Sequence, residues 1–361
     1  MGNGGQWDPL ALPLRMGLYI NFTRRALEQI RGGAMGIVGL PVFDYTGGVM
    51  EAGKFLTVEG DKAAETAVGK ANAGPAKRAL ARGASEVLIY AVPPGQIPES
   101  EEFDYTAIRD EFEAMPFNVF VYPSAVPVSE KEAAVSWTAR NRKEGKHFTF
   151  VTGGSAEDDQ DPTVGNARSI LLADDYVVNL INGAIDGSGN ELPSEEYAVD
   201  VAGLIAGTPI NQGITNQNMP ISDVNKRLTN AETIAALESG SLVITNDGKD
   251  KYIERGVTTK YSGGKEGKIR AMRARQAIAT DLPATAKKHY LGKLDNEPTG
   301  QKLLLAAIMK YLDTLVLNKV LHQDYFLGLD PERKSEGDCV FLIVDAEEVD
   351  SMERIFVDFG V

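Results

Sequence analysis

The chain has 361 residues, of which 43% are hydrophobic and 24% charged, values that are ordinary for a globular protein of two or three domains. Its net charge of -14 argues against general nucleic-acid binding, and its single cysteine, Cys339, excludes an intramolecular disulfide framework and a cysteine metal cluster. No apolar run approaches the roughly 20 residues that span a bilayer, and the start does not resemble a secretory signal. We therefore expect synthesis in the cytoplasm without membrane insertion.

The charge is unevenly distributed along the chain. Residues 249–310 contain 14 Lys or Arg against 6 Asp or Glu, a net of +8, so the remainder carries -22. This basic stretch could face an acidic partner, or it could be a solvated basic surface.

The N-terminal residues 1–24 are predicted to form an extended arm that contains one strand. Residues 1–14 contain Gly and Pro and have no periodicity, whereas the next residues alternate between two faces, with Leu18, Ile20 and Phe22 on one of them. Residues 25–98 then combine short apolar runs with turn signals, which predicts a small β-rich domain. The predicted arm strand consists of Leu18, Tyr19, Ile20, Asn21 and Phe22.

The middle of the chain, residues 99–228, has the pattern of an α/β domain. It follows a linker-like segment at residues 93–101, and apolar strands then alternate with helices. This alternation predicts βαβ units and a mostly parallel sheet. The expected helices lie at Tyr105–Glu113, Ser129–Lys143, Ala167–Ala173 and Ser194–Ala206, and the strands at residues 117–123, 147–153 and 176–181.

Residues 229–350 are predicted to be a mixed α+β C-terminal domain. Asp247-Gly248 between apolar runs predicts a hairpin, and residues 301–322 carry the apolar stripe of a core-facing helix. Cys339 opens an apolar run at 339–346, which predicts a buried strand with a core thiol. Residues 351–361 form a terminal arm strand in which Ile355, Val357 and Phe359 alternate with Phe356 and Asp358.

The sequence offers no complete set of catalytic residues. Its three histidines lie in separate segments without metal-ligand spacing, and no P-loop is present. Gly33, Gly36 and Gly39 fit a dinucleotide fingerprint only loosely, because Pro41 ends the run. Ser155 lacks a nucleophile elbow, and the acidic run 157–161 has no calcium-loop spacing, so we expect loops at both. We therefore expect no enzyme activity, no cofactor and no metal.

The two terminal strands leave two alternatives open. An unpaired strand has backbone groups without hydrogen-bond partners, so each strand must join a sheet. It could close a sheet of its own subunit, or it could add to a sheet of a neighbouring subunit, which produces a polymer.

Four stretches resemble contractile phage tail sheath proteins. Residues 16–26 (MGLYINFTRRA) are similar to the opening of that family, and residues 349–361 (VDSMERIFVDFGV) to its end. Residues 202–220 resemble the end of the family's middle domain, and the hairpin followed by the basic run at 269–278 also fits. The resemblance covers essentially the whole chain and is greatest to the short sheaths of Gram-positive myophages, defective prophages and phage-tail-like bacteriocins. Met16-Gly17 stands where Pro-Gly is common in the family.

The resemblance implies a structural subunit of stacked hexameric rings that form a contractile helical sheath. It implies a subtilisin-like middle domain without protease activity, and arms that complete a sheet in a neighbouring subunit. The implied partners are an inner tail tube, baseplate and tail terminator proteins, with no nucleic acid, and the implied location is the virion tail, assembled in the bacterial cytoplasm. The basic stretch would then hold the acidic tube or, alternatively, acidic residues of neighbouring subunits. The candidates are Arg270, Arg273, Arg275, Lys287 and Lys288.

Two rival hypotheses stay open at this point. An α/β hydrolase or nucleotide-binding enzyme would use its terminal strands to close its own sheet. A tube or baseplate protein of the same machine is a weaker rival, because a tube protein would be much shorter.

Overall fold

The computed structural model describes residues 4–5, 18–19, 36–94, 103–290 and 292–360. The chain divides into a short unit, residues 1–34, and a second unit, residues 35–361. In the first unit, β1 (Gly4–Gly5) pairs in parallel with β2 (Leu18–Tyr19).

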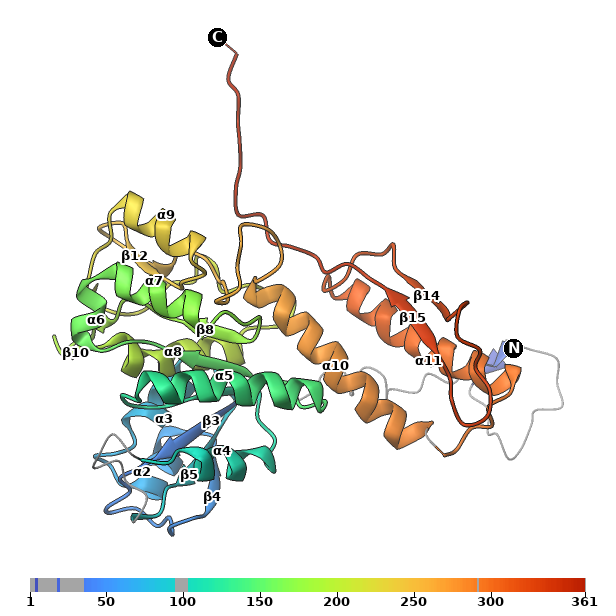
Figure 1. Ribbon diagram of the computed structural model, residues 1–361, viewed down its shortest axis with the longest axis horizontal. Coiled ribbons are helices and arrows are strands. Elements are labelled where there is room, and N and C mark those ends of the chain that lie inside the picture. The colour runs from blue at the N-terminus through green and yellow to red at the C-terminus, as the bar shows by residue number, and fades with distance from the viewer. Residues whose placement is uncertain (1–3, 6–17, 20–35, 95–102, 291, 361) are drawn as a thin grey trace. The chain divides into compact units, whose positions relative to one another are not determined.

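The second unit is organised around a six-stranded sheet with the order β4-β5-β3-β6-β7-β8 (Figure 1). Every neighbouring pair in this sheet is parallel except β4 and β5, which are antiparallel. The strands are short and mostly buried, as expected for a sheet that is covered on both faces. They are β3 (Ile37–Val42), β4 (Phe55–Val58), β5 (Glu86–Ala91), β6 (Val119–Val121), β7 (Thr149–Thr152) and β8 (Val177–Asn179).

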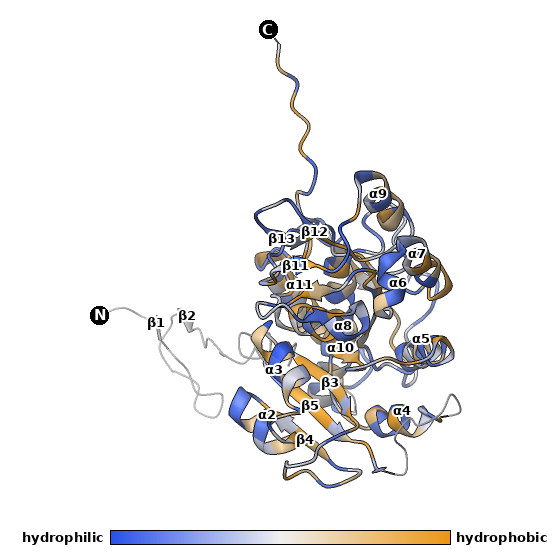
Figure 2. Cartoon of the chain, turned by 90° about the vertical axis from the view of Figure 1, so that its left-hand side faces the viewer, coloured by the Kyte–Doolittle hydropathy of each residue, from blue (hydrophilic) through white to orange (hydrophobic). Residues whose placement is uncertain are grey.

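Helices cover both faces of this sheet, and alternate strand residues face the two layers. In β6, Val119 and Val121 pack into one core and Phe120 packs into the other. Figure 2 shows the hydrophobic strands β3 and β5 between their covering helices. The first core contains residues of α2 (Asp61–Val68), α3 (Gly74–Ala81) and α8 (Ser194–Gly207), and the second contains residues of α4 (Thr106–Glu113) and α5 (Val128–Lys143).

The structure corrects one domain expectation. Residues 25–98 were expected to form a separate β-rich domain, but β3 pairs directly with β6, with Val38 opposite Val119. Strands on both sides of residue 98 thus belong to one sheet, and α2 and α3 cover it. The physical reason is that β3 and β5 are apolar on both faces and need helices on each side. The expected linker falls largely on residues 95–102, outside the described residues.

The predicted βαβ alternation is confirmed after β6. Helix α5 connects β6 to β7, and α6 (Ala156–Gln160) and α7 (Pro162–Leu171) connect β7 to β8. The predicted hairpin is also present, with Gly248 at φ +98° in its turn. The smaller elements here are β9 (Ala184–Ile185), β10 (Glu191–Leu192), β11 (Asp223–Val224), α9 (Asn230–Glu238), β12 (Ile244–Asn246) and β13 (Lys251–Ile253).

A buried ion pair holds α3 against α8. The Asp200 carboxylate, with a side chain only 1% exposed, accepts hydrogen bonds from Arg78 Nε and Arg82 Nε, each at 2.9 Å. Arg78 of α3 and Arg82, which caps the C-terminus of α3, therefore neutralise one buried carboxylate of α8.

The C-terminal part consists of two long helices and a hairpin. Helix α10 (Ile269–His289) is followed by α11 (Pro298–Leu317), as the apolar stripe predicted, and Leu312 and Leu315 of α11 are buried. Strands β14 (Phe326–Leu329) and β15 (Leu342–Asp345) form an antiparallel two-stranded sheet. The prediction of a core thiol is wrong, because Cys339 precedes β15 and is exposed. Among the described residues, no helix is both long and apolar enough to cross a membrane.

Candidate assembly interface

The C-terminal tail is the most exposed apolar segment that the structure describes. Residues 351–360 belong to no helix or strand, and Figure 1 shows the C-terminal end of the chain running away from the other elements as an extended trace. Phe356 and Phe359 are each 88% exposed, Ile355 is 73% exposed and Val357 is 63% exposed. Burial of such side chains drives association, so a run of four within five residues marks an interaction segment.

The predicted terminal strand is therefore absent within this subunit. Asp358, like the four apolar residues around it, is exposed and has no strand partner in the part of the chain that the structure describes. The alternative in which this segment closes a sheet of its own subunit is wrong for the described conformation.

A sheet with open edges lies in the same part of the chain. β14 and β15 pair only with each other among the described strands, so the outer edge of each is free to accept another strand. Two strands alone are marginally stable in water. Phe326 is 57% exposed and Val344 is 42% exposed, which leaves apolar surface on both strands for an added strand to cover.

The N-terminal candidates are described only in part. Leu18 and Tyr19 form β2, which pairs with two glycines over two residues only. Ile20, Asn21 and Phe22 lie outside the described residues.

The basic candidates of α10 contact their own chain. Arg270 Nη1 donates to Ser351 Oγ at 2.8 Å, and Arg275 Nε donates to Glu348 Oε1 at 2.6 Å. Burial raises the pKa of Glu348, but the hydrogen bond and charge of Arg275, a backbone hydrogen bond and the charge of Lys265 together outweigh burial and lower the pKa. Part of the basic stretch is thus already paired with the chain's own residues, including the acidic Glu348.

Arg273 does not have the surface position that was expected of it. Its side chain is buried, and the guanidinium donates to the backbone carbonyls of Thr208 and Pro209. Burial lowers the pKa of Arg273 to about 10. A side chain enclosed in this way cannot reach another protein, so the prediction of a tube-facing role is wrong for Arg273. Lys287 and Lys288 lie near the end of α10, and their side chains are outside the described residues.

The basic stretch contains further residues that contact the tail, and the sequence analysis missed them. Lys268 Nζ lies 2.7 Å from Asp350 Oδ2 and 2.9 Å from Glu353 Oε2. Arg255 donates to the same Glu353 oxygen from Nε at 3.0 Å and from Nη2 at 2.8 Å. The available signal was the acidic run 345–353, which follows a basic stretch of opposite charge.

The carboxyl end of β7, where α/β enzymes bind ligands, is filled by the protein's own side chains. Ser194 Oγ donates to Asp159 Oδ1 at 2.5 Å, and Asn225 Nδ2 donates to Asp159 Oδ2 at 2.7 Å. Ser155 caps α6 by accepting from the Asp158 N–H. Ser155 itself lies in the loop that was expected, just before α6. The loop expected for the acidic run 157–161 is wrong, because residues 157–160 belong to α6 and Asp159 is buried.

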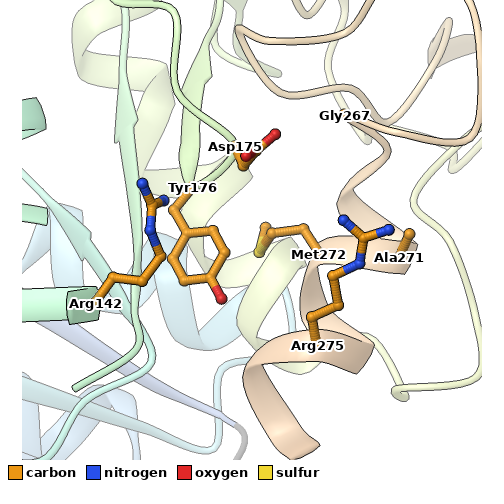
Figure 3. Close-up of a pocket in the computed structure, with 7 residues that line it drawn as sticks. All are labelled: Arg142, Asp175, Tyr176, Gly267, Ala271, Met272 and Arg275. Carbon is orange, nitrogen blue, oxygen red and sulfur yellow. The ribbon is translucent and has the colours of Figure 1, made fainter. Parts of the chain in front are cut away.

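A small cavity lies between α10 and the end of α5. Figure 3 shows Arg142 and Tyr176 on one side and Met272 and Arg275 on the other. Its volume of about 190 Å³ is below the range of roughly 300–1,000 Å³ typical of ligand pockets. Both arginines already bind carboxylates, Arg142 that of Asp174 and Arg275 that of Glu348. Among the described residues, no group of three or more His, Cys, Asp or Glu could hold a metal ion.

Comparison with known proteins identifies what this architecture is similar to. Residues 99–259 match the family model of the phage tail sheath protein central domain, and residues 264–361 match that of the phage tail sheath C-terminal domain. An uncharacterized protein of Bacillus subtilis (strain 168), YqbK, is 25% identical over 278 residues, or 72% of this chain. The chain spans 56% of the length of that relative.

Solved structures of sheath proteins share the fold. A sheath tail protein from Desulfitobacterium hafniense is 19% identical, with a TM-score of 0.70 over 92% of this chain and 100% of that one. A sheath tail protein from Listeria innocua is 17% identical, with a TM-score of 0.66 over 90% of this chain and 97% of that one. The helical sheath of the anti-feeding prophage in its contracted state is 15% identical, with a TM-score of 0.70 over 97% of this chain and 99% of that one.

Proposed function

This chain belongs to the phage tail sheath protein family and is a structural subunit of a contractile sheath, and we propose that its C-terminal tail links each subunit to a neighbour. The observation that carries the proposal is the exposed tail, in which apolar residues alternate along a segment without strand partners. An extended peptide of this kind is suited to adding a strand to an open sheet edge. Inter-subunit links made in this way join subunits without a dedicated docking domain.

The β14–β15 sheet is the proposed receiving surface. Its edges offer main-chain groups, and its exposed side chains offer apolar contacts. Ile355, Val357 and Phe359 share one face of the incoming strand, so this face would pack against the receiving subunit while Asp358 faces away. The N-terminal residues Leu18–Phe22 would supply a second link, because their alternation is the same.

The geometry of the proposed link determines the assembled state, because contacts between successive subunits that do not close into a ring continue without limit. Head-to-tail contacts of this type generate helical polymers, and we propose stacked hexameric rings around an inner tail tube. Contraction would release free energy stored at assembly as subunits rotate and bury more surface, at roughly 25 cal/mol per Å² of apolar area. The tails would keep neighbouring subunits connected during this movement, which would drive the tube through a target cell envelope.

Several finer features belong to the same proposal. The parallel strands β3, β6, β7 and β8 support a subtilisin-like middle domain, and the filled carboxyl edge of the sheet supports a role without catalysis. Lys287 and Lys288 stay candidates for contact with the tube. The remaining proposed partners are baseplate and tail terminator proteins, and the proposed location is the virion tail after assembly in the bacterial cytoplasm.

Deletion of Arg354–Val361 tests the link. We expect the shortened chain to fold, since these residues are exposed, and to form no long tubes by negative-stain electron microscopy. A matched variant keeps the length and composition of the last eight residues but breaks the apolar alternation. It should also form no long tubes. Tubes of normal length from the deleted chain would overturn the proposal, whereas circular dichroism would identify a variant that fails to fold.

A further inference from the structure

The segment before the tail is fixed to the body of the subunit in two ways. Its first residues use the backbone: the His322 N–H donates to the Glu347 carbonyl at 2.8 Å, and the Val349 N–H donates to the Val320 carbonyl at 2.9 Å. Beyond Val349, no backbone hydrogen bond connects residues 350–360 to the rest of the described chain. Any order in residues 350–353 must therefore come from side chains.

Those side-chain contacts converge on Glu353. One of its oxygens accepts from Arg255 and Lys268, and the other accepts from Thr215 Oγ1 at 2.9 Å. Lys268 also binds Asp350, so one ammonium group bridges two carboxylates that lie three residues apart. We call Arg255, Lys268, Asp350 and Glu353 the clasp.

Three of the four clasp residues are shielded from solvent, whereas the Asp350 side chain is 37% exposed and the residues after the clasp are exposed. The side chains of Lys268 and Glu353 are 8% and 10% exposed, and that of Arg255 is 16% exposed. Ion pairs at this depth are screened far less than surface pairs, and removal of one partner leaves the other charge desolvated. From Arg354 onward every described residue is exposed. The boundary between the part of the chain that is held and the part that is free is therefore sharp, and it lies between Glu353 and Arg354.

We propose that the clasp positions the inter-subunit link by placing the hinge of the tail at Arg354, well after the end of β15. This inference rests on the proposed function of the tail as a link. The free segment is then residues 354–361, which span at most about 26–29 Å when fully extended. Without the clasp, the chain is free from residue 350, and its reach grows to about 40–43 Å. Arg255, Lys268 and Glu353 are positioning residues, because they fix where the strand starts and how far it can extend.

The basic stretch thereby acquires a function within its own subunit. Its surplus charge neutralises the acidic run 347–353, through Lys265 and Arg275 at Glu348 and through the clasp at Asp350 and Glu353. These cations are engaged before any partner protein binds.

The test compares mobility on both sides of the proposed hinge. A nitroxide spin label is attached at position 352 or at position 359, each in a Cys339→Ser background, since Cys339 is the single native cysteine. Met352 is 84% exposed and Phe359 is 88% exposed, so neither label displaces a packed side chain. Each labelled chain is also made with Glu353→Gln, which removes the charge and keeps the shape, or with Asp358→Asn, which makes the same type of change in the free segment.

Below the critical concentration for polymerisation, where the tail is free, we expect a restricted label at 352 and a freely mobile label at 359 in the parent chain. Glu353→Gln should lower the clasped population about tenfold, free the label at 352 and lower the thermal unfolding midpoint slightly. Asp358→Asn should leave the label restricted and the unfolding midpoint unchanged. Equal mobility at 352 and 359 in the parent chain, or no response to Glu353→Gln, would overturn the clasp.

Polymer formation separates this inference from the proposed function. Glu353→Gln should raise the critical concentration for polymerisation about tenfold. If the label is freed but the critical concentration is unchanged, the clasp exists without positioning the link, and this inference fails. If the parent chain forms no polymer, the proposed function fails, while the labels still decide whether the clasp holds residues 350–353.

Discussion

Phe359 and Phe356 provide a matched pair that tests whether the tail acts as a strand. Both side chains are 88% exposed in the subunit, so the same chemical group is available for burial at each position. They lie three residues apart and therefore project to opposite faces of an extended chain. If the tail packs one face of a strand against a neighbour, loss of one Phe should weaken assembly much more than loss of the other. If the tail is unstructured and adhesive, the two losses should have similar effects.

The expected magnitude follows from the exposed fraction. Full burial of a Phe side chain contributes about 1.5–3 kcal/mol, and nearly all of this gain is still available at 88% exposure. Phe359→Ala should thus weaken each link by about 1.5–2.5 kcal/mol and raise the critical concentration about 10- to 70-fold. Phe356→Ala, on the face shared with Asp358, should raise it only a fewfold.

Sedimentation of polymer across a concentration series measures this difference directly. Circular dichroism and thermal unfolding of the two variants should match the parent chain, because neither side chain packs within the subunit. Equal increases for Phe356→Ala and Phe359→Ala would refute the strand model and leave an adhesive tail. A larger effect at Phe356 would show that the opposite face is the buried one.

Three further predictions concern the stability of the subunit. Asp200→Asn leaves Arg78 and Arg82 without their buried counter-ion and should lower the free energy of unfolding by about 3–5 kcal/mol, measured by denaturant titration. Tyr311→Phe removes the 3.0 Å hydrogen bond that joins α11 to Asp281 of α10 and should cost about 1–3 kcal/mol in the same assay. Burial raises the pKa of Glu353, but hydrogen bonds from Lys268, Arg255 and Thr215 and the charge of Lys268 together outweigh burial and lower the pKa. The clasp should therefore persist at pH values above the usual glutamate pKa of about 4.3 and be lost as the pH falls through the lowered pKa of Glu353. The spin label at position 352 should report that release.

Each of these predictions has its own control. Asp61→Asn removes an exposed carboxylate near Lys77 and should change stability by less than about 1 kcal/mol, so an equal loss at Asp61 and Asp200 would contradict the ion-pair argument. Tyr325→Phe removes an exposed hydroxyl that donates to Asp313, and its effect should be smaller than that of Tyr311→Phe. A label at 352 that becomes mobile near pH 6 would contradict the carboxylate assignment, because a group with a lowered pKa stays ionised there.

The periodic elements could be predicted from the sequence because their signals are local. The helix at α11, the hairpin at Asp247-Gly248 and the βαβ alternation each depend on residues within one turn or one strand. The partner of a strand depends on distant residues, and for this reason the pairing of β3 with β6 was missed. Short apolar runs between turns are compatible with a separate β domain and with one shared sheet, and the helices that cover both faces decide between them.

The candidate site shows the same division between local and distant signals. The alternation in residues 355–359 marks an apolar strand face, and the structure leaves those residues exposed. The surplus of cations in residues 249–310 was visible, but charge counting gives no information about which cations are buried or paired. Arg273 is enclosed, and Lys268 binds the chain's own acidic run, so only the three-dimensional arrangement separates these two roles from a surface that awaits a partner.

A helical reconstruction of the assembled polymer by electron cryomicroscopy tests the central claim most directly. The account predicts continuous density from Glu353 into a neighbouring subunit, with residues 355–359 hydrogen-bonded as an added strand at an edge of that subunit's β14–β15 sheet. Density in which residues 355–359 fold back onto their own subunit, or in which that sheet gains no strand from another chain, would contradict it.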